Sequence, residues 1–230
     1  MSTKLSEAAL LSHSAFHLIL ASGSARRREL LTDAGFLFSV LPPRSGAEED
    51  AEASLYGATP ELLVKTLART KARDVVSMLL NGTLVPRLDG LATASIVANA
   101  PLVVLACDSV AVCDGEILGK PVDRADAERM LRRLSGSRHS VVTGLCLALL
   151  SRESTSRELE RVETSTLQMD ELSEEQLSAY LASNLWQGKA GAFGYQDGNS
   201  WLELLSGEES NVVGLPLEAL AQILVENFSA

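Results

Sequence analysis

The sequence has few cysteines and no long apolar run, and each shortage excludes a class of protein. Three cysteines in 230 residues are too few for a disulfide framework. Cys107, Cys113 and Cys146 lie in apolar runs without metal-ligand spacing, so we expect buried, reduced thiols. No apolar run reaches the ~18 residues of a membrane-spanning helix. Residues 1–16 also lack the basic start and apolar core of a signal peptide, which predicts a soluble, cytoplasmic protein.

Positive charge is also scarce, because the formal net charge is −10. Non-specific binding to nucleic acid requires a basic surface that neutralises phosphates, so we expect no nucleic-acid partner. A small anionic substrate remains compatible with this charge if the basic residues gather locally. The sequence also lacks a nucleophile elbow, a Walker A loop and a GxGxxG fingerprint, which excludes the commonest nucleophile and nucleotide motifs.

The hydrophobic pattern predicts an α/β or mixed α+β protein with a central mixed sheet flanked by helices. Residues 18–21 form an apolar run that ends at a serine and glycine turn, and a helix-compatible stretch follows to Ala34. The further predicted strands are 36–41, 102–107, 110–113, 116–118, 139–150, 161–169 and 201–205. The further predicted helices are 60–80, 124–134, 174–182 and 216–227. We expect one domain over 1–230, with 1–17 as an N-terminal extension and 81–100 as a surface insertion.

Three consecutive arginines stand at the start of the first predicted helix, after Ser22 and Ser24. Cations are disfavoured at a helix N-terminus, where free backbone N–H groups create a partial positive charge. The same N–H groups bind anions, so Arg26, Arg27 and Arg28 make sense if a phosphate docks there. The alternative is a solvated basic face.

Asp108 follows the fully apolar stretch 102–107. A carboxylate at the C-terminal end of a buried strand lies where ligand crevices form in open α/β sheets. Burial without a partner is costly, so a metal, a water or a lysine should contact it. Its role could be metal ligand or general base for water. A capping or turn carboxylate is the alternative.

Two lysines stand in small-residue backbone, Lys120 between Gly119 and Pro121 and Lys189 between Gly188 and Ala190. Such backbone lets a ligand approach closely, and a lysine there suits a phosphate. An exposed lysine without a function is the alternative for each. The run Glu48-Glu49-Asp50 could supply carboxylates to a metal, or form a solvated acidic loop.

Taken together, these residues resemble the Maf family of nucleoside triphosphate pyrophosphatases, in particular its dTTP/UTP-cleaving branch. The resemblance is carried, in the family's order, by residues 20–31, 68–72, 107–109, 119–121 with 134–136, and 188–196 with 211–216. It implies a fold similar to inosine triphosphate pyrophosphatases, with two lobes, a cleft and a homodimer. The implied activity is metal-dependent attack of water on the α/β phosphoanhydride of a nucleoside triphosphate, giving the monophosphate and pyrophosphate.

The resemblance also implies roles for individual residues. Asp108 would be the catalytic carboxylate, and Glu48 or Glu49 would help it to hold Mg²⁺ or Mn²⁺. The triphosphate would be bound by Ser22, Arg26, Arg27, Lys71, Lys120 and Lys189. The dTTP/UTP branch shows Arg, Thr and Gln at three specificity positions, where this chain has Arg26, Ser109 and Gln196.

The chain departs from the family pattern at three positions of the 188–197 segment. Gly188 replaces the usual Asp before Lys-Ala-Gly, and Tyr195 and Asp197 replace the usual Ile and Gly around Gln196. The lost carboxylate leaves room for a regulator that binds nucleotide without hydrolysis. The other departures bear on base selectivity, so the same chemistry on a modified or other base is a second alternative.

Overall fold

The structure is a computed structural model that describes residues 2–44, 46, 55, 57–81, 101–151 and 154–229, without the side chains of 151 and 154–156. Its sheet has seven strands in the order β2-β1-β3-β5-β6-β7, with β4 paired to β3. The strands are β1 (His17–Leu20), β2 (Phe38–Val40), β3 (Leu102–Cys113), β4 (Glu116–Leu118), β5 (Arg138–Ser151), β6 (Ser154–Met169) and β7 (Leu202–Ser206). The helices are α1 (Thr3–Leu11), α2 (Ala25–Asp33), α4 (Pro60–Leu80), α5 (Arg124–Leu134), α6 (Glu174–Ala182), α7 (Glu209–Val213) and α8 (Leu217–Phe228).

The sheet is mixed, which confirms the predicted fold class. Strand β1 pairs in parallel with β2 and with β3, whereas β3 pairs antiparallel with β4 and β6 antiparallel with β7. Asp114 and Gly115 join β3 to β4 with positive φ angles of 46° and 82°. Two consecutive positive φ angles belong to the type I′ turn that the Asp-Gly pair predicted.

The predicted helix starts are confirmed by side-chain caps. Thr59 accepts a hydrogen bond from the Leu62 backbone N–H, and Pro60 occupies the first turn of α4. Asp123 caps α5 in the same way, and Ser173 with Gln176 forms a complete capping box for α6. Such caps satisfy backbone N–H groups that have no partner inside the helix, so they set where each helix begins.

Two predicted strand boundaries are wrong, and in both cases the observed strand is longer than the predicted one. Strand β3 does not end before Asp108 but continues to Cys113, because it exchanges its partner β1 for β4 along its length. Asp108 therefore lies inside a strand and is neither a strand-end, a cap nor a turn residue. Strand β6 begins at Ser154, where a polar loop up to Glu160 was expected.

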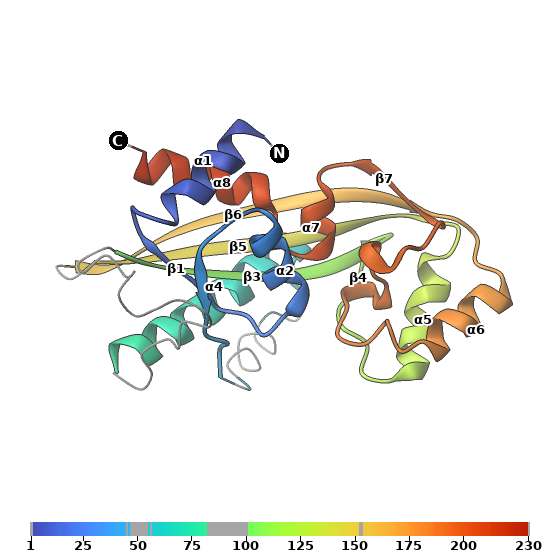
Figure 1. Ribbon diagram of the computed structural model, residues 1–230. Coiled ribbons are helices and arrows are strands. Elements are labelled where there is room, and N and C mark those ends of the chain that lie inside the picture. The colour runs from blue at the N-terminus through green and yellow to red at the C-terminus, as the bar shows by residue number, and fades with distance from the viewer. Residues whose placement is uncertain are drawn as a thin grey trace. The chain divides into compact units, whose positions relative to one another are not determined.

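Helices α1 and α7 were not predicted. In Figure 1, α1 lies beside α8, and the N- and C-terminal segments are thus neighbours. Leu5, Ala8 and Ala9 are buried in this contact. Ser2 Oγ also donates to Glu218 Oε2 at 2.7 Å.

The chain divides into two compact units. The first comprises residues 1–108, 144–162 and 215–230, and the second comprises 109–143 and 163–214. Apolar clusters fill each unit, and all three cysteines are free and buried, as expected. The predicted single domain stays a prediction, and the expected insertion lies outside the described residues except for Asn81.

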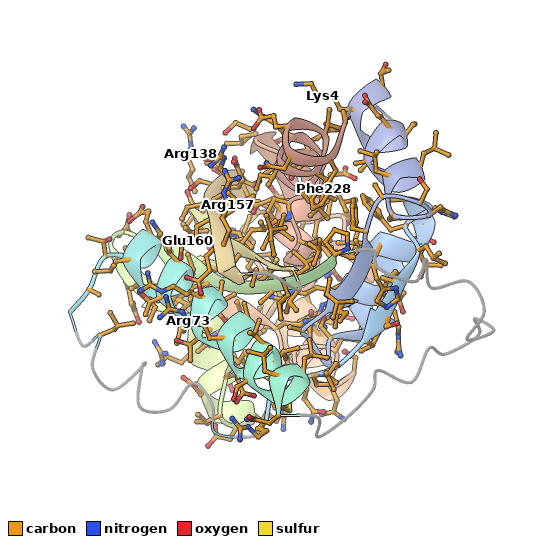
Figure 2. The ribbon with its side chains drawn as sticks, turned by 90° about the vertical axis from the view of Figure 1, so that its left-hand side faces the viewer. Lys4, Arg73, Arg138, Arg157, Glu160 and Phe228 are labelled. Carbon is orange, nitrogen blue, oxygen red and sulfur yellow. The ribbon has the colours of Figure 1, made fainter. Side chains whose placement is uncertain are left out.

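Helix α4 packs closely on β5 and β6 within the first unit. A Cβ atom on Gly144 would collide with the backbone of Val64 and Lys65, so only glycine allows this approach. Arg73 donates to both carboxylate oxygens of Glu158, at 2.7 and 2.8 Å. Figure 2 shows Arg73 on α4 and Glu160 on β6, the strand that carries Glu158. Within the described ranges, no helix is both long and apolar enough to cross a membrane.

Candidate active site

The first feature of the candidate site is a buried ion pair between α4 and β3. Lys71 Nζ donates to Asp108 Oδ1 at 2.6 Å, and the two side chains are 6% and 10% exposed. Of the three partners expected for the Asp108 carboxylate, the structure therefore shows the lysine. Asp108 follows Leu105, the last β3 residue that pairs with β1. The pair thus lies beyond the carboxyl end of β1, the place where open α/β sheets bind ligands.

The turn after β1 leads into α2 and carries the predicted phosphate-binding residues. Ser24 caps α2 and accepts from the Arg27 backbone N–H. Ser22 is buried, and its Oγ accepts from the Ser24 N–H at 3.2 Å and from Arg27 Nη1 at 3.3 Å. Arg26 and Arg27 are half-buried on the first turn of α2. The local structure therefore joins hydroxyl groups, the N-terminal N–H groups of α2 and guanidinium groups, all of which can bind an anion.

The pKa of the Cys107 thiol is affected by charges from both the start of α2 and the Lys71–Asp108 pair. Burial raises the pKa of its thiol to about 11, while the positive charges of Arg27 and Lys71 oppose this increase and Asp108 adds to it. The guanidinium of Arg27 and the Lys71–Asp108 pair therefore act on the same buried point. Ser22, Arg27, Lys71 and Asp108 all belong to the first unit.

The second unit holds another buried ion pair. Lys189 Nζ donates to both carboxylate oxygens of Asp197 at 2.5 Å, and the side chains are 8% and 11% exposed. Tyr180 donates its hydroxyl hydrogen to Asp197 Oδ2 at 2.6 Å and accepts from the Gly194 N–H at 3.1 Å. Lys189 is therefore not exposed, and its charge is balanced inside the protein.

The remaining predicted lysine is connected to the same loop through the backbone. The Gly191 N–H donates to the Gly119 carbonyl at 3.0 Å, which fixes the Gly119-Lys120-Pro121 turn against residues 188–192. Lys120 itself is exposed. Lys120 and Lys189 therefore stand on two backbone segments that are bonded to each other.

Of the predicted specificity residues, Arg26 belongs to the first unit, whereas Ser109 and Gln196 occupy different surroundings within the second unit. Thr143 Oγ1 lies 2.9 Å from Ser109 Oγ and 3.2 Å from the carbonyl oxygen of Asn211. Gln196 is exposed, and its neighbour Tyr195 donates to Glu209 Oε1 on α7 at 3.2 Å. Ser109 is thus held by a hydroxyl network, whereas Gln196 lies on the surface.

The described residues supply only some of the ligands that a divalent metal ion needs. No group of three histidine, cysteine, aspartate or glutamate side chains gathers there, and Asp108 offers one carboxylate. Carboxylate oxygens are suitable ligands for Mg²⁺. Glu48 and Glu49, the other predicted ligands, lie outside the described residues.

Sequence reasoning missed the partners of Lys189 and Ser109. Gly188 suggests that the carboxylate next to Lys189 is lost, but the carboxylate of Asp197 forms an ion pair with the Lys189 ammonium. The unusual aspartate after Gln196 was the available signal. For Tyr180 and Thr143 no signal existed, because both lie in ordinary helix or strand sequence.

These features define an α/β protein with two buried carboxylate–lysine pairs and several further cationic groups, a set suited to an anionic, phosphorylated ligand. The chain belongs to the family described as Maf-like protein, whose model matches residues 17–227.

Individual relatives cover most of the chain. A dTTP/UTP pyrophosphatase of Rhodopirellula baltica is 47% identical over 214 residues, covering 92% of this chain and 82% of that protein. A dTTP/UTP pyrophosphatase of Geotalea uraniireducens is 38% identical, covering 87% and 90%. Among solved structures, a HAM1 protein from Coxiella burnetii is 17% identical, with a TM-score of 0.39, covering 92% of this chain and 99% of that one.

Proposed function

We propose that this protein hydrolyses nucleoside triphosphates to the monophosphate and pyrophosphate. The family relationship supports this activity, since relatives that share most of the chain are named dTTP/UTP pyrophosphatases. The structural observation that carries the proposal is the buried Lys71–Asp108 pair beside the anion-binding start of α2. It supplies a carboxylate for water next to groups that bind phosphate.

The chemistry follows from the charges. Lys71 holds the Asp108 carboxylate in place through a hydrogen bond, and this carboxylate accepts a proton from water. The resulting hydroxide forms a bond to the α-phosphorus, and the bond from this phosphorus to the bridging α–β oxygen breaks. Pyrophosphate leaves with the negative charge that develops, and cations stabilise that charge. We assign triphosphate binding to Ser22, Arg26, Arg27, Lys71, Lys120 and Lys189.

We also propose a divalent metal, Mg²⁺ or Mn²⁺, held by Asp108 with Glu48 or Glu49. When bound, such an ion neutralises phosphate charge and polarises a phosphoryl oxygen. Asp108 suits this role because it lies beyond Leu105, the last β3 residue that pairs with β1, and open α/β sheets bind ligands at this end of their strands. The residues of the chain itself orient the substrate and accept the proton.

The preferred substrates are proposed to be dTTP and UTP, with Arg26, Ser109 and Gln196 as the residues that select the base. The names of the relatives support this choice. Ser109 is positioned by Thr143, whose hydroxyl lies 2.9 Å from it. A modified or other base is the alternative substrate.

The resemblance further supports a cytoplasmic homodimer in which residues 1–230 act as one domain. Light scattering after size-exclusion chromatography tests the dimer. A mass of two chains is expected, and the 24.5 kDa mass of one chain would contradict it.

The activity is tested with a panel of dTTP, UTP, CTP, GTP and modified nucleotides, each with Mg²⁺ or Mn²⁺. We expect monophosphate and pyrophosphate, fastest from dTTP and UTP. Asp108→Asn should reduce kcat by at least about 100-fold, because it removes the proton acceptor. Asp170→Asn is the charge-matched control, since Asp170 is exposed at the end of β6. Tight nucleotide binding without any product would instead indicate a regulator.

A further inference from the structure

The contact between Lys189 and Asp197 is more confined than a surface ion pair. Both carboxylate oxygens of Asp197 accept hydrogen bonds from the Lys189 ammonium, and less than an eighth of either side chain is exposed. Tyr180 donates a third hydrogen bond to this carboxylate, and its own oxygen accepts from the Gly194 N–H. The Tyr180 ring also packs edge-on against Trp201, with 5.5 Å between the ring centroids. Asp197 is therefore fixed from two sides.

The backbone of this segment is shaped around the pair. A Cβ atom on Gly194 would collide with Lys189 Nζ and with the Asp197 carboxylate, so the pair lies directly on the glycine backbone. Gly191 and Ala192 have φ angles of 67° and 62°. A left-handed conformation is unfavourable for alanine, and such strain persists only where the surrounding structure enforces it. The turn thereby brings residues 189 and 197 together.

We propose that Asp197 is a positioning residue that acts through Lys189. It holds the ammonium in one orientation, so that Lys189 can donate to a phosphate oxygen of the nucleoside triphosphate. An ammonium has three donors, and Asp197 occupies two of them. The third donor is available to the substrate. This role rests on the proposed function.

The physical reason is the cost of a buried charge. A buried ammonium without a counter-charge is costly, and the Asp197 carboxylate provides that counter-charge for Lys189. Tyr180 donates to the same carboxylate, so Asp197 is held in the position that faces Lys189.

Two other roles of Asp197 lead to different results. A purely structural pair would affect stability but not the kinetics of the folded enzyme. A competing carboxylate, which withholds Lys189 from the substrate, would make removal of Asp197 tighten nucleotide binding.

The test is steady-state kinetics of dTTP hydrolysis by Asp197→Asn, with Asp170→Asn as the charge-matched control. We expect kcat/KM to fall at least about thirtyfold, mainly through a higher KM, since one partner of a buried charge pair is lost. Asp197→Glu, which retains the charge, should recover part of this loss. Unchanged kinetics or a lower KM in folded Asp197→Asn would overturn the proposal.

Tyr180→Phe provides a second measurement in case Asp197→Asn fails to fold. It keeps both charges but removes a hydrogen bond to the carboxylate, so a several-fold higher KM is expected. A double-mutant cycle completes the test, because Asp197→Asn should cost little activity once Lys189→Met has removed the ammonium. Additive losses would contradict an action through Lys189. A wild-type protein that cleaves no nucleotide would refute the proposed function itself, whereas an active one with additive variants would refute only the role of Asp197.

Discussion

At the scale of single residues, the Lys71–Asp108 contact connects stability with chemistry. Lys71→Met leaves a buried carboxylate without its counter-charge, which should lower the free energy of unfolding by about 3–5 kcal/mol. Denaturant unfolding measures this loss. Adding Asp108→Asn should recover a large part of it, because the unpaired charge is then absent.

The control for this prediction lies on the same helix. Lys65 pairs with Glu160 at 3.0 Å, but its side chain is 44% exposed. Surface pairs of this kind contribute little, so Lys65→Met should change stability by less than about 1 kcal/mol. Equal losses in Lys71→Met and Lys65→Met would contradict the assignment of a buried, charged pair.

His139 makes folding sensitive to acid. Its ring is buried and packs edge-on against Phe193, with the ring centroids 5.2 Å apart, and burial lowers its pKa from 6.5 to about 4. Between these two values the unfolded chain binds a proton that the folded chain does not. The free energy of unfolding should therefore be unaffected by His139 above pH 6.5 and should fall by about 3 kcal/mol as the pH decreases towards 4.

Unfolding midpoints at several pH values test this, with His139→Phe and the control His13→Gln. His139→Phe should show a weaker pH dependence than the wild type, although buried His17, whose pKa is also lowered by burial, retains its part. Exposed His13 should leave the dependence unchanged. An identical acid response in His139→Phe would show that this ring does not carry the effect.

The sequence predicted individual site residues better than their partners. Asp108 was singled out because a carboxylate after a fully apolar stretch requires compensation, and a lysine was among the expected partners. The carboxylate partner of Lys189 was not predicted. The contact with Asp197 depends on turns at Gly191 and Ala192, and positive φ angles at these positions follow from tertiary packing.

At the scale of elements, caps predicted helices well, while apolar patterns predicted strand ends poorly. Thr59, Asp123 and Ser173 cap their helices through hydrogen bonds to residues three positions later, so these helix starts are predictable from the sequence. The polar pair Asp108-Ser109 suggested a strand end, yet β3 continues because β4 replaces β1 as its partner. A change of partner is a property of the sheet and cannot be read from one strand.

The packing of α4 on β5 depends on Gly144. Gly144→Ala places a methyl group against the α4 backbone, which cannot give way as a side-chain end can. We expect a loss of about 1–3 kcal/mol in the free energy of unfolding. Gly23→Ala is the control, since its Cβ would meet no atom within 4 Å. Equal stability of the two variants would contradict the close approach.

At the scale of the whole molecule, the N-terminal residues are more than an extension. The family model begins at residue 17, but α1 packs on α8 within the first unit. Leu5→Ala should therefore lower the free energy of unfolding by about 2–5 kcal/mol, because it removes a buried side chain. Leu10→Ala should have little effect, since Leu10 is 71% exposed. Thermal or denaturant unfolding compares the two, and similar values would contradict the packing of α1.

The net charge of −10 is also a property of the whole chain, so an anionic ligand would depend on local positive groups such as the buried lysines. Among the described residues, each unit carries a buried lysine held by a carboxylate, Lys71 in the first and Lys189 in the second. An acidic protein that binds a triphosphate needs such local positive groups. Their presence agrees with an anionic substrate despite the overall charge.

The position of bond cleavage is the most direct test of the proposed activity. The protein is incubated with dTTP and Mg²⁺ in ¹⁸O-labelled water, and the products are identified by ³¹P NMR and mass spectrometry. Attack at the α-phosphorus predicts dTMP that carries the label and unlabelled pyrophosphate, with both products lost in Asp108→Asn. Label in pyrophosphate, or formation of dTDP and inorganic phosphate, would contradict the proposed chemistry.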